Sequence, residues 1–401
     1  MTAEFSTVKQ AVDAIARGEV VIVVDAEDRE NEGDYICAAE KATSESINLV
    51  LSGRGDFCLS VLPETAERLE LAPLVEDNNS KLATAFMTPL DHVDCRTGVT
   101  ADERCLTVKT IADPSSRPED FVRPGHVHLL VAKQGGVLRR AGHTEASVDL
   151  VRMAGLQPAG VLCEILDETG NRASREELLK LAERQNLQII SIEQLIAHRR
   201  VSEKLVHRAA EAKLPTKYGD FEIVVYSVDF EDLEPVAFRM GDLSNSEEPP
   251  LVRMHSSCFT GDVLTSLRCD CGDQLHMALE MISRNGCGAV VYLPQEGRGI
   301  GLAEKIKAYA LQDQGLDTVE ANHALGHKAD MRDYGVGLQI LKDLGLSKLR
   351  LLTNNPKKIE AFNLRGYDVQ VVDQVPIVSA ANEHNEKYLE TKRDKMGHHL
   401  P

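Results

Sequence analysis

Three cysteines lie close together in the second half of the chain, at Cys258, Cys269 and Cys271. No second CxxC or HxxxH pair lies nearby to complete the four-ligand set of a structural zinc site. Three protein ligands with an open fourth position are typical of a catalytic zinc, which activates water toward an electrophile. The alternative, three ordinary buried thiols, is disfavoured because thiols this close in a reduced compartment usually bind metal.

The first half carries a different group of reactive side chains. Carboxylates crowd the segment 25–34, directly after the apolar run 19–24. Charge runs are usually solvated loops, but a loop after a core strand is where α/β folds gather ligand sites. Carboxylates together with waters suit a hard cation such as Mg²⁺. His126 and His143 each follow a glycine and have arginines close by, which favours a role at the same site.

These residues need helices and strands to position them, and the first half shows both patterns. Ser6 can cap a helix that ends at Gly18, and the β-branched run 19–24 predicts a buried strand. Ser174 and Glu177 form a capping box that predicts the start of another helix. Beyond it, the patterns predict a strand over 187–190 and a helix from 192 to 198.

The charged segment 198–221 reads as a linker into a second domain. That domain is predicted to begin with a strand over 221–228. Strand-to-helix units are expected at 289–315 and at 348–358, and the helix of the first unit should bury one apolar face. The residues expected on that face are Leu302, Ile306, Tyr309 and Ala310.

The length and composition of the chain limit its domain organisation and its possible functions. The 401 residues are long for one core, so we expect two domains, 1–201 and 202–401, of mixed α+β or α/β class, each a mixed sheet flanked by helices. A net charge of −18 without a basic tract argues against nucleic-acid binding, and no apolar run approaches a membrane span. The N-terminus lacks a signal region and the nine cysteines suit a reduced compartment, so a cytoplasmic location is expected.

Several motifs of the second half resemble GTP cyclohydrolase II, in the same order along the chain. They lie at 253–262, 268–274, 295–302, 317–322, 329–333 and 352–358. The resemblance implies one zinc on the three cysteines and hydrolysis of GTP to 2,5-diamino-6-(5-phospho-ribosylamino)pyrimidin-4(3H)-one, formate and pyrophosphate, with Mg²⁺ on the triphosphate. The GTP-binding residues it implies are Arg253, Met254, His255, Ser256, Ser257, Gln274, Glu296, Gly297, Arg298, Thr318, Thr353 and Lys358.

The same resemblance assigns Asp330 as proton acceptor and Arg332 as the group that attacks the α-phosphorus. Arginine is a poor nucleophile because its pKa is above about 12, so chemistry alone favours Arg332 as a phosphate clamp. Ser257 departs from the family, which usually has glutamate there.

Motifs of the first half resemble 3,4-dihydroxy-2-butanone 4-phosphate synthase. They lie at 25–34, 97–101, 123–127, 139–147 and 160–164. The resemblance implies conversion of D-ribulose 5-phosphate to 3,4-dihydroxy-2-butanone 4-phosphate and formate. It implies Mg²⁺ or Mn²⁺ on Glu30 and His143, with His126 and Glu164 as acid and base. The substrate-binding residues it implies are Arg29, Glu30, Asp34, Arg140, Ala141, Gly142, His143, Thr144 and Glu164.

Both halves together resemble the bifunctional riboflavin-pathway family, and we expect a homodimer. Ala141, Glu103 and His128 depart from the common synthase pattern. A dinucleotide site at 290–301 is disfavoured because its glycines are spaced GxGxG rather than GxGxxG. The alternative that stays open is that only one half is catalytic and the other is a scaffold or regulatory domain.

Overall fold

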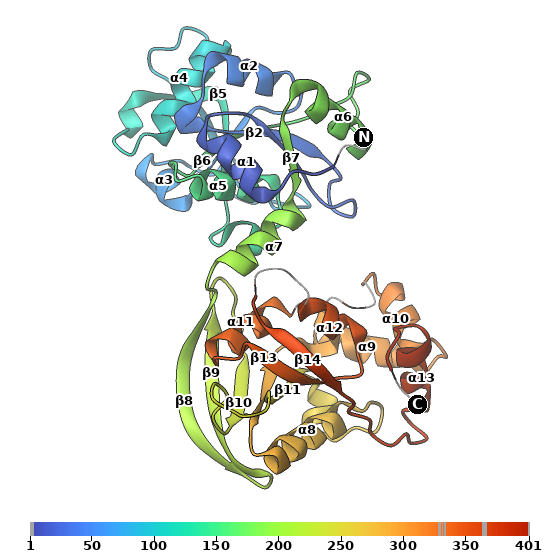
Figure 1. The fold of residues 1–401 in the computed structure, drawn as a ribbon. Helices are drawn as coiled ribbons and strands as arrows, with labels where there is room; N and C mark the ends of the chain where they lie inside the picture. The colour runs from blue at the N-terminus through green and yellow to red at the C-terminus, as the bar shows by residue number, and fades with distance from the viewer. Residues whose placement is uncertain (1–3, 328–329, 331, 333, 363–366, 400–401) are drawn as a thin grey trace. The chain divides into compact units, whose positions relative to one another are not determined.

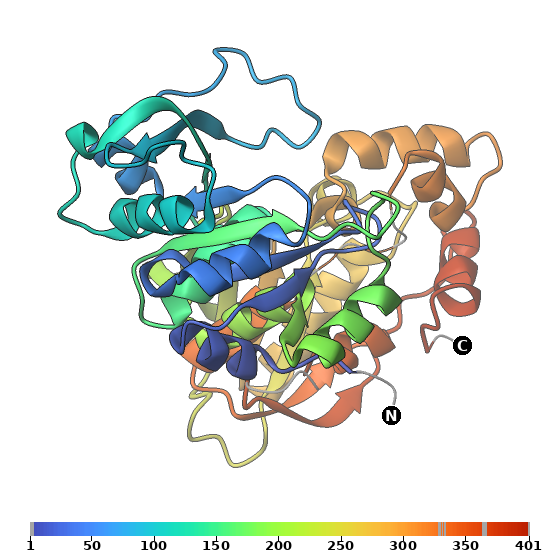
Figure 2. The same cartoon turned by 90° about the horizontal axis from the view of Figure 1, so that it is seen from above.

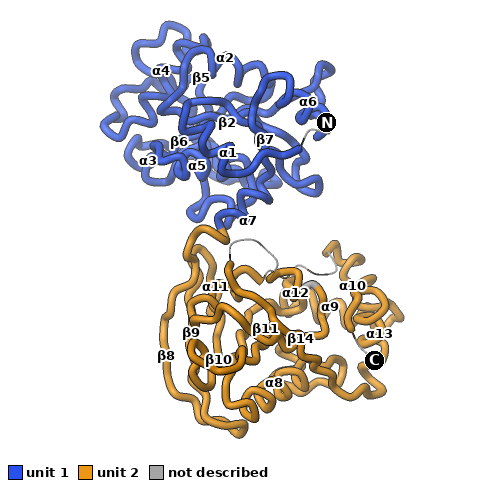
Figure 3. Tube along the Cα trace, viewed as in Figure 1, with its two compact units in different colours: residues 1–199 blue, residues 200–401 orange. Residues whose placement is uncertain are grey.

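The computed structural model describes residues 4–327, 330, 332, 334–362 and 367–399. The chain divides into two compact units, 1–199 and 200–401 (Figure 3). Each contains a mixed seven-stranded sheet flanked by helices, as the sequence predicts (Figure 1). No helix in the described part of the chain is both long and apolar enough to cross a membrane.

The sheet of the first unit has the strand order β4-β5-β3-β6-β2-β1-β7. Its strands are β1 (Val21–Val24), β2 (Gly33–Ala38), β3 (Cys58–Val61), β4 (Phe86–His92), β5 (Phe121–Val131), β6 (Ala159–Glu164) and β7 (Gln188–Ser191). Its helices are α1 (Val8–Ala16), α2 (Ser44–Leu51), α3 (Pro63–Arg68), α4 (Ala101–Ala112), α5 (His143–Met153), α6 (Arg175–Gln185) and α7 (Ile192–Ser202), with short 3₁₀ turns η1 (Ala39–Lys41), η2 (Pro118–Asp120) and η3 (Gly136–Leu138).

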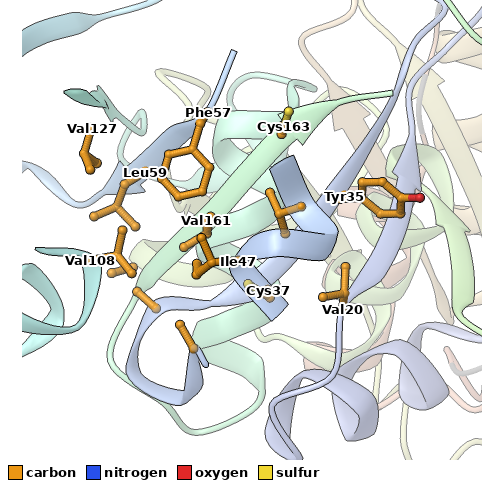
Figure 4. Close-up of a cluster of buried hydrophobic side chains, with 14 of the residues drawn as sticks. Val20, Tyr35, Cys37, Ile47, Phe57, Leu59, Val108, Val127, Val161 and Cys163 are labelled. Carbon is orange, nitrogen blue, oxygen red and sulfur yellow. The ribbon is translucent and has the colours of Figure 1, made fainter. Parts of the chain in front are cut away.

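Both faces of this sheet are buried. Successive side chains of a strand point to opposite faces, and in β1 Ile22 and Val24 enter one core cluster while Val21 and Val23 enter another. Figure 4 shows part of the first cluster, where Leu59 and Val161 of neighbouring strands lie among residues from α2 and α4. A strand buried on both faces reads as a continuous apolar run, which is why the run 19–24 predicts β1 well.

The sheet of the second unit has the order β14-β13-β11-β12-β10-β9-β8. Its strands are β8 (Val206–Thr216), β9 (Gly219–Val228), β10 (Val236–Met240), β11 (Leu251–Ser256), β12 (Gly288–Leu293), β13 (Lys348–Leu352) and β14 (Gln370–Val375). Its helices are α8 (Cys271–Asn285), α9 (Leu302–Gln312), α10 (Thr318–Ala324), α11 (Gly335–Asp343), α12 (Pro356–Phe362) and α13 (Glu386–Asp394), with shorter turns η4 (Phe259–Val263) and η5 (Glu296–Gly299).

Three neighbouring strands of this sheet explain how distant motifs meet. β11 is parallel to both β12 and β13. The carboxyl ends of parallel strands lie at the same edge, and the segments after β11, β12 and β13 begin with Ser257, Pro294 and Thr353. Motifs separated by about a hundred residues therefore converge at one edge of the sheet.

Two expectations about element boundaries are wrong. Thr7, not Ser6, caps α1: its hydroxyl accepts from Gln10 N at 3.2 Å, while Ser6 Oγ accepts from Ile189 N. The segment 198–221 is not a linker, because α7 continues to Ser202 and β8 pairs antiparallel with β9. β8 is exposed on both faces, so it has none of the apolar alternation by which a strand is recognised.

The expected buried face of α9 is also wrong. Leu302 and Ile306 are 41% and 47% exposed, whereas the buried residues of this helix are Lys305 and Ala308. The helix turns a lysine inward because that lysine has anionic partners at the site described below. The other elements predicted from the second half, β9, β12, β13 and the starts of α9 and α12, are confirmed.

Candidate active sites

The three clustered cysteines meet in space. Cys258 follows β11, Cys269 lies in the next loop and Cys271 begins α8. The Sγ atoms of Cys258 and Cys269 are 3.7 Å apart, and all three sulfurs lie within 4.8 Å of one another. Zn–S bonds of about 2.3 Å at tetrahedral angles place sulfurs about 3.8 Å apart, so the thiols fit a zinc ion. A Cβ on Gly261 would lie 2.9 Å from Cys269 Sγ, so this close approach needs glycine.

Two adjoining cavities open beside the thiols and gather most of the predicted GTP residues. The first is lined by Ser256, Ser257, Cys258, Cys269, Cys271, Glu296, Gly297, Arg298, Thr318 and Arg332. The second adds Arg253, His255, Gln274, Thr353 and Lys358. Met254 is the exception, since its side chain is buried in the core and only its carbonyl faces this region, accepting from Lys358 Nζ at 2.6 Å.

The wall of these cavities carries cationic side chains, some of whose nitrogens lack a hydrogen-bond partner among the described residues. Both terminal nitrogens of Arg298 and the Nε of Arg253 are buried without a hydrogen-bond partner among the described residues. Burial, with the charges of Arg253, Arg332 and Lys392, holds the pKa of Lys358 well below its usual range. Unpaired buried donors are costly, so this wall suits an anionic group such as a triphosphate.

Asp330 and Arg332 form a two-point ion pair, with Nε to Oδ1 at 2.8 Å and Nη2 to Oδ2 at 2.6 Å. Burial opposes the charge on Asp330, but the hydrogen bonds and charge of Arg332 outweigh it and keep the pKa of Asp330 below its usual value. Burial likewise opposes the charge on Arg332, yet the hydrogen bonds that Arg332 donates to Asp330 raise the pKa of Arg332. Arg332 is therefore held as a cation. Positions 329, 331 and 333 of this motif lie outside the described residues.

Glu296 is tied to the thiol cluster through a lysine that the sequence did not reveal. Lys305 Nζ donates to Glu296 Oε1 at 2.8 Å, to Thr260 Oγ1 at 2.9 Å and to Cys258 Sγ at 3.0 Å. The other oxygen of Glu296 accepts from Phe259 N at 2.6 Å. Hydrogen bonds from Cys269 and Cys271, together with Lys305, hold the pKa of the Cys258 thiol well below its usual range. The only sequence signal for Lys305 is its place in a helix after the glycine-rich loop.

In the first unit, ligand atoms of Asp25, Glu30 and His143 lie within 4.8 Å of one another. Asp25 directly follows β1, and His143 is the first residue of α5. His143 Nε2 lies 3.1 Å from Val23 O. With Nε2 donating to this carbonyl oxygen, Nδ1 is the nitrogen available as a metal ligand. Burial lowers the pKa of His143 to about 4, and a neutral imidazole is the form that binds metal. Asp25 was missed as a third candidate ligand.

Carboxylates crowd around this cluster. Asp34 is buried, and its Oδ1 has no hydrogen-bond partner among the described residues. Burial, with the charges of Glu164 and Glu32, raises the pKa of Asp34 well above the usual value. Burial and Glu30 also raise the pKa of Glu32 to about 7. A bound cation would relieve this repulsion, so the donor set fits Mg²⁺ or Mn²⁺.

Glu164 belongs to this cluster, because it pairs directly with Asp34 across β6 and β2. Its Oε2 accepts from Asp56 N at 2.7 Å. His126 lies on β5 instead, 49% exposed, with Nδ1 2.7 Å from Asp91 Oδ2. No hydrogen bond joins His126 to Glu164 among the described residues. Asp91 was not among the site residues predicted from the sequence.

The predicted phosphate loop precedes α5, with Gly142 as the helix N-cap and Thr144 buried in the first turn. Arg140 donates to Glu145 Oε2 at 2.8 Å and to Thr84 Oγ1 at 2.9 Å. Arg29 pairs with Asp25 at 2.9 Å and also contacts Glu30. Ala141 is exposed in this loop.

The departures from the family patterns are accommodated locally. Glu103 accepts from the backbone nitrogens of Arg96 and Thr97 at 2.6 and 3.1 Å, so the longer acid closes the loop before α4. His128 lies opposite Cys58 and packs edge-on against Phe86. Ser257 faces the thiol cavity, and its backbone nitrogen donates to Leu293 O at 2.8 Å.

Known families match the chain in two blocks. Residues 9–198 match 3,4-dihydroxy-2-butanone 4-phosphate synthase, and residues 207–376 match GTP cyclohydrolase II. The riboflavin biosynthesis protein RibBA of Bacillus mycoides is 52% identical over 397 residues, which are 99% of each chain. The chain belongs to the bifunctional RibBA family. The RibBA of Bacillus subtilis is 51% identical over the same share.

Solved structures are also similar to this chain. RibBX of A. baumannii, described as a two domain 3,4-dihydroxy-2-butanone 4-phosphate synthase, is 32% identical with a TM-score of 0.69, covering 92% of this chain and 99% of its own. A 3,4-dihydroxy-2-butanone 4-phosphate synthase solved in complex with two magnesium ions is 36% identical over 49% of this chain and 98% of its own, with a TM-score of 0.46. Like other RibBA proteins, this chain joins a synthase domain and a cyclohydrolase domain.

Proposed function

We propose that the second unit hydrolyses GTP at the three-thiol site, releasing formate and pyrophosphate. The observation that carries this proposal is the close approach of the Cys258, Cys269 and Cys271 thiols beside a wall of buried cations, whose Arg298 and Arg253 keep N–H groups without a partner among the described residues. One zinc ion bound there would supply a Lewis acid that activates water for attack on the guanine C8. The triphosphate, with Mg²⁺, would lie against Arg298, Arg253 and Lys358.

In this proposal Arg332 binds phosphate rather than attacking it. The ion pair with Asp330 keeps the guanidinium protonated, and a protonated guanidinium has no free electron pair. The remaining terminal nitrogen, Nη1, would donate to a phosphate oxygen. Asp330, held ionised, is the proton acceptor in the family-based assignment. Glu296 Oε2 accepts one bond and retains a lone pair for the guanine edge.

We propose that the first unit converts D-ribulose 5-phosphate to 3,4-dihydroxy-2-butanone 4-phosphate and formate. Glu30 and His143 would hold Mg²⁺ or Mn²⁺, with Asp25 as a further ligand. The metal would supply charge that stabilises an enediolate. Glu164, beside the buried Asp34, would move protons at the sugar carbons. His126, oriented through Nδ1 by Asp91, would present Nε2 as the second acid or base.

Arg29 and Asp34 would contact the sugar hydroxyls, and the loop from Arg140 through Thr144 would bind the phosphate at the start of α5. The protein is expected to be a cytoplasmic homodimer, which size-exclusion chromatography with light scattering would test.

The second candidate function is a chain with only one active half. It is favoured by RibBX, whose description names the synthase activity alone. The thiol triad and the buried cations argue for a working second unit here.

Replacing Cys269 with Ser separates these possibilities. We expect the variant to lose zinc and to release at least about 100-fold less formate from GTP, because a ligand of the Lewis acid is gone. Formate release from ribulose 5-phosphate should stay unchanged. Loss of both activities in a folded variant would contradict two independent sites, and absence of GTP turnover in the unsubstituted protein would favour the scaffold.

A further inference from the structure

The segment from Asn385 to His399 lies beyond the GTP cyclohydrolase II match, which ends at residue 376, yet it reaches the cyclohydrolase cavities. α13 lies beside α10, as Figures 1 and 2 show. Lys395 joins the two helices through Asp317 and through Glu320 at 3.0 Å. The segment is fixed again near its end, where His399 N donates to Asn354 O at 2.9 Å.

Two side chains of α13 face the site. Tyr388 lines both cavities, with the guanidinium of Arg298 5.8 Å from its ring centre. Lys392 donates to both oxygens of Asp270, at 2.7 and 2.9 Å. This pair is nearly excluded from solvent, since the side chains of Lys392 and Asp270 are 8% and 1% exposed.

The partner of Lys392 occupies a special place. Asp270 stands between the thiols of Cys269 and Cys271. It also accepts from Gln274 Nε2 at 2.7 Å, and Gln274 Oε1 in turn accepts from Arg253 Nη2 at 2.5 Å. A buried, charge-assisted chain of hydrogen bonds therefore runs from Lys392 through Asp270 and Gln274 to a cation of the phosphate wall.

We infer that Lys392 is a positioning residue of the cyclohydrolase reaction, and that the segment 385–399 is one wall of its site. Lys392 fixes the carboxylate of Asp270. Asp270 in turn holds the loop that carries the two thiols and, through Gln274, orients the guanidinium of Arg253. Without Lys392, Asp270 would be a buried carboxylate with no counter-charge next to anionic thiolates. This inference rests on the proposed function of the second unit.

The test compares Lys392→Met with Lys387→Met in the full chain. Methionine keeps the apolar stem and removes the charge, and Lys387 is an exposed lysine on the same helix. Zinc affinity is measured by competition with a chelator, alongside KM and kcat for GTP. Loss of a residue that orients metal ligands typically costs about 10–100-fold, so we expect zinc affinity to fall by that factor and KM to rise. Lys387→Met should match the unsubstituted protein.

The outcomes separate cleanly. If Lys392→Met keeps the zinc affinity and KM of Lys387→Met, the inference is wrong. If the unsubstituted protein binds zinc but turns over no GTP, the proposed function fails, while the zinc comparison still decides the role of Lys392. If Lys392→Met does not fold, Asp270→Asn is compared with Asp270→Asn/Lys392→Met. Since Lys392 acts through the charge of Asp270, the double variant should bind zinc no more weakly than Asp270→Asn alone. Weaker zinc binding by the double variant would overturn the inference.

Discussion

Ser257 lines the thiol cavity, one residue before the first of the three candidate zinc ligands. The family usually places a glutamate there, which would add negative charge beside thiolates. Here Glu296 has its own partners, because it accepts from Lys305 Nζ and from Phe259 N. Neither of these contacts involves Ser257.

We predict that the natural protein turns over GTP, and that Ser257→Glu changes KM by less than about tenfold. A peripheral hydrogen bond is worth about 1 kcal/mol, whereas loss of a buried charged partner costs several. The measurement is steady-state formate release at varied GTP, with Ser257→Ala as the control for side-chain loss. GTP turnover that appears only in the glutamate variant would show that this half is naturally inactive.

Glu103 is another residue that departs from its family pattern, and it should make the free energy of unfolding depend on pH. Backbone hydrogen bonds from Thr97 and Arg96 lower its pKa to about 2. An acid with a lowered folded pKa stabilises the fold above its unfolded pKa of about 4.3, and this contribution is lost as pH falls toward 2. Glu103→Gln should therefore unfold at lower urea than the natural protein at pH 7, and the gap should narrow by pH 3. Glu67→Gln, an exposed change in α3, should show no such trend.

At the scale of elements, the loop between β4 and α4 packs closely against Asp91, the acid on β4 that contacts His126. Gly98 in this loop has φ +76, and a Cβ there would lie 2.0 Å from Asp91 Oδ2. Asp91 contacts both the backbone nitrogen and Nδ1 of His126. A side chain at position 98 would thus push aside the carboxylate on which the histidine depends.

We predict that Gly98→Ala lowers kcat for ribulose 5-phosphate by about 100-fold or more, because a positioned acid–base group is typically worth that factor. Gly170→Ala is the matched control. Gly170 has φ +83 with open space around its Cα, so both variants carry the left-handed strain of about 1 kcal/mol. Equal activity in the two variants would contradict a role for Asp91 in orienting His126.

The sequence predicted elements best where local signals were strong. The run 19–24, the Ser174 capping box and the strand-turn-helix units after β12 and β13 all correspond to elements of the structure. It was wrong for β8, whose exposed residues show no apolar alternation, and for the face of α9, whose buried Lys305 contacts Cys258, 47 residues away. Asp25, Asp91, Lys305 and Lys392 were missed for the same reason: Lys392 lies 122 residues from Asp270. Periodicity cannot report such contacts.

At the scale of the whole molecule, the two sites lie in separate compact units. Neither activity needs the product of the other, and the candidate metal ligands of each site come from one unit alone. After metal removal, magnesium alone should therefore restore the reaction of the first unit, while the reaction of the second unit should need zinc as well.

We predict that a fragment of residues 1–201 is soluble and forms formate from ribulose 5-phosphate with Mg²⁺. EDTA should reduce that rate by at least about 100-fold, and added Mg²⁺ should restore it, since the crowded carboxylates need a cation. In the full chain after chelation, Mg²⁺ alone should restore only the ribulose 5-phosphate reaction, whereas the GTP reaction should need zinc together with Mg²⁺. Turnover by the fragment in excess EDTA would refute the metal assignment.

β8 has one more consequence. It ends the strand order of its sheet, and every side chain from His207 to Lys213 is exposed. An outer strand with free backbone groups can recruit strands from other molecules, and such edges are protected by charges and proline. Arg208, Glu211, Lys213 and Pro215 supply that protection here. The charged residues and the proline that make β8 resemble a linker in the sequence are thus also the ones that we expect to disfavour aggregation through this strand during synthesis and storage.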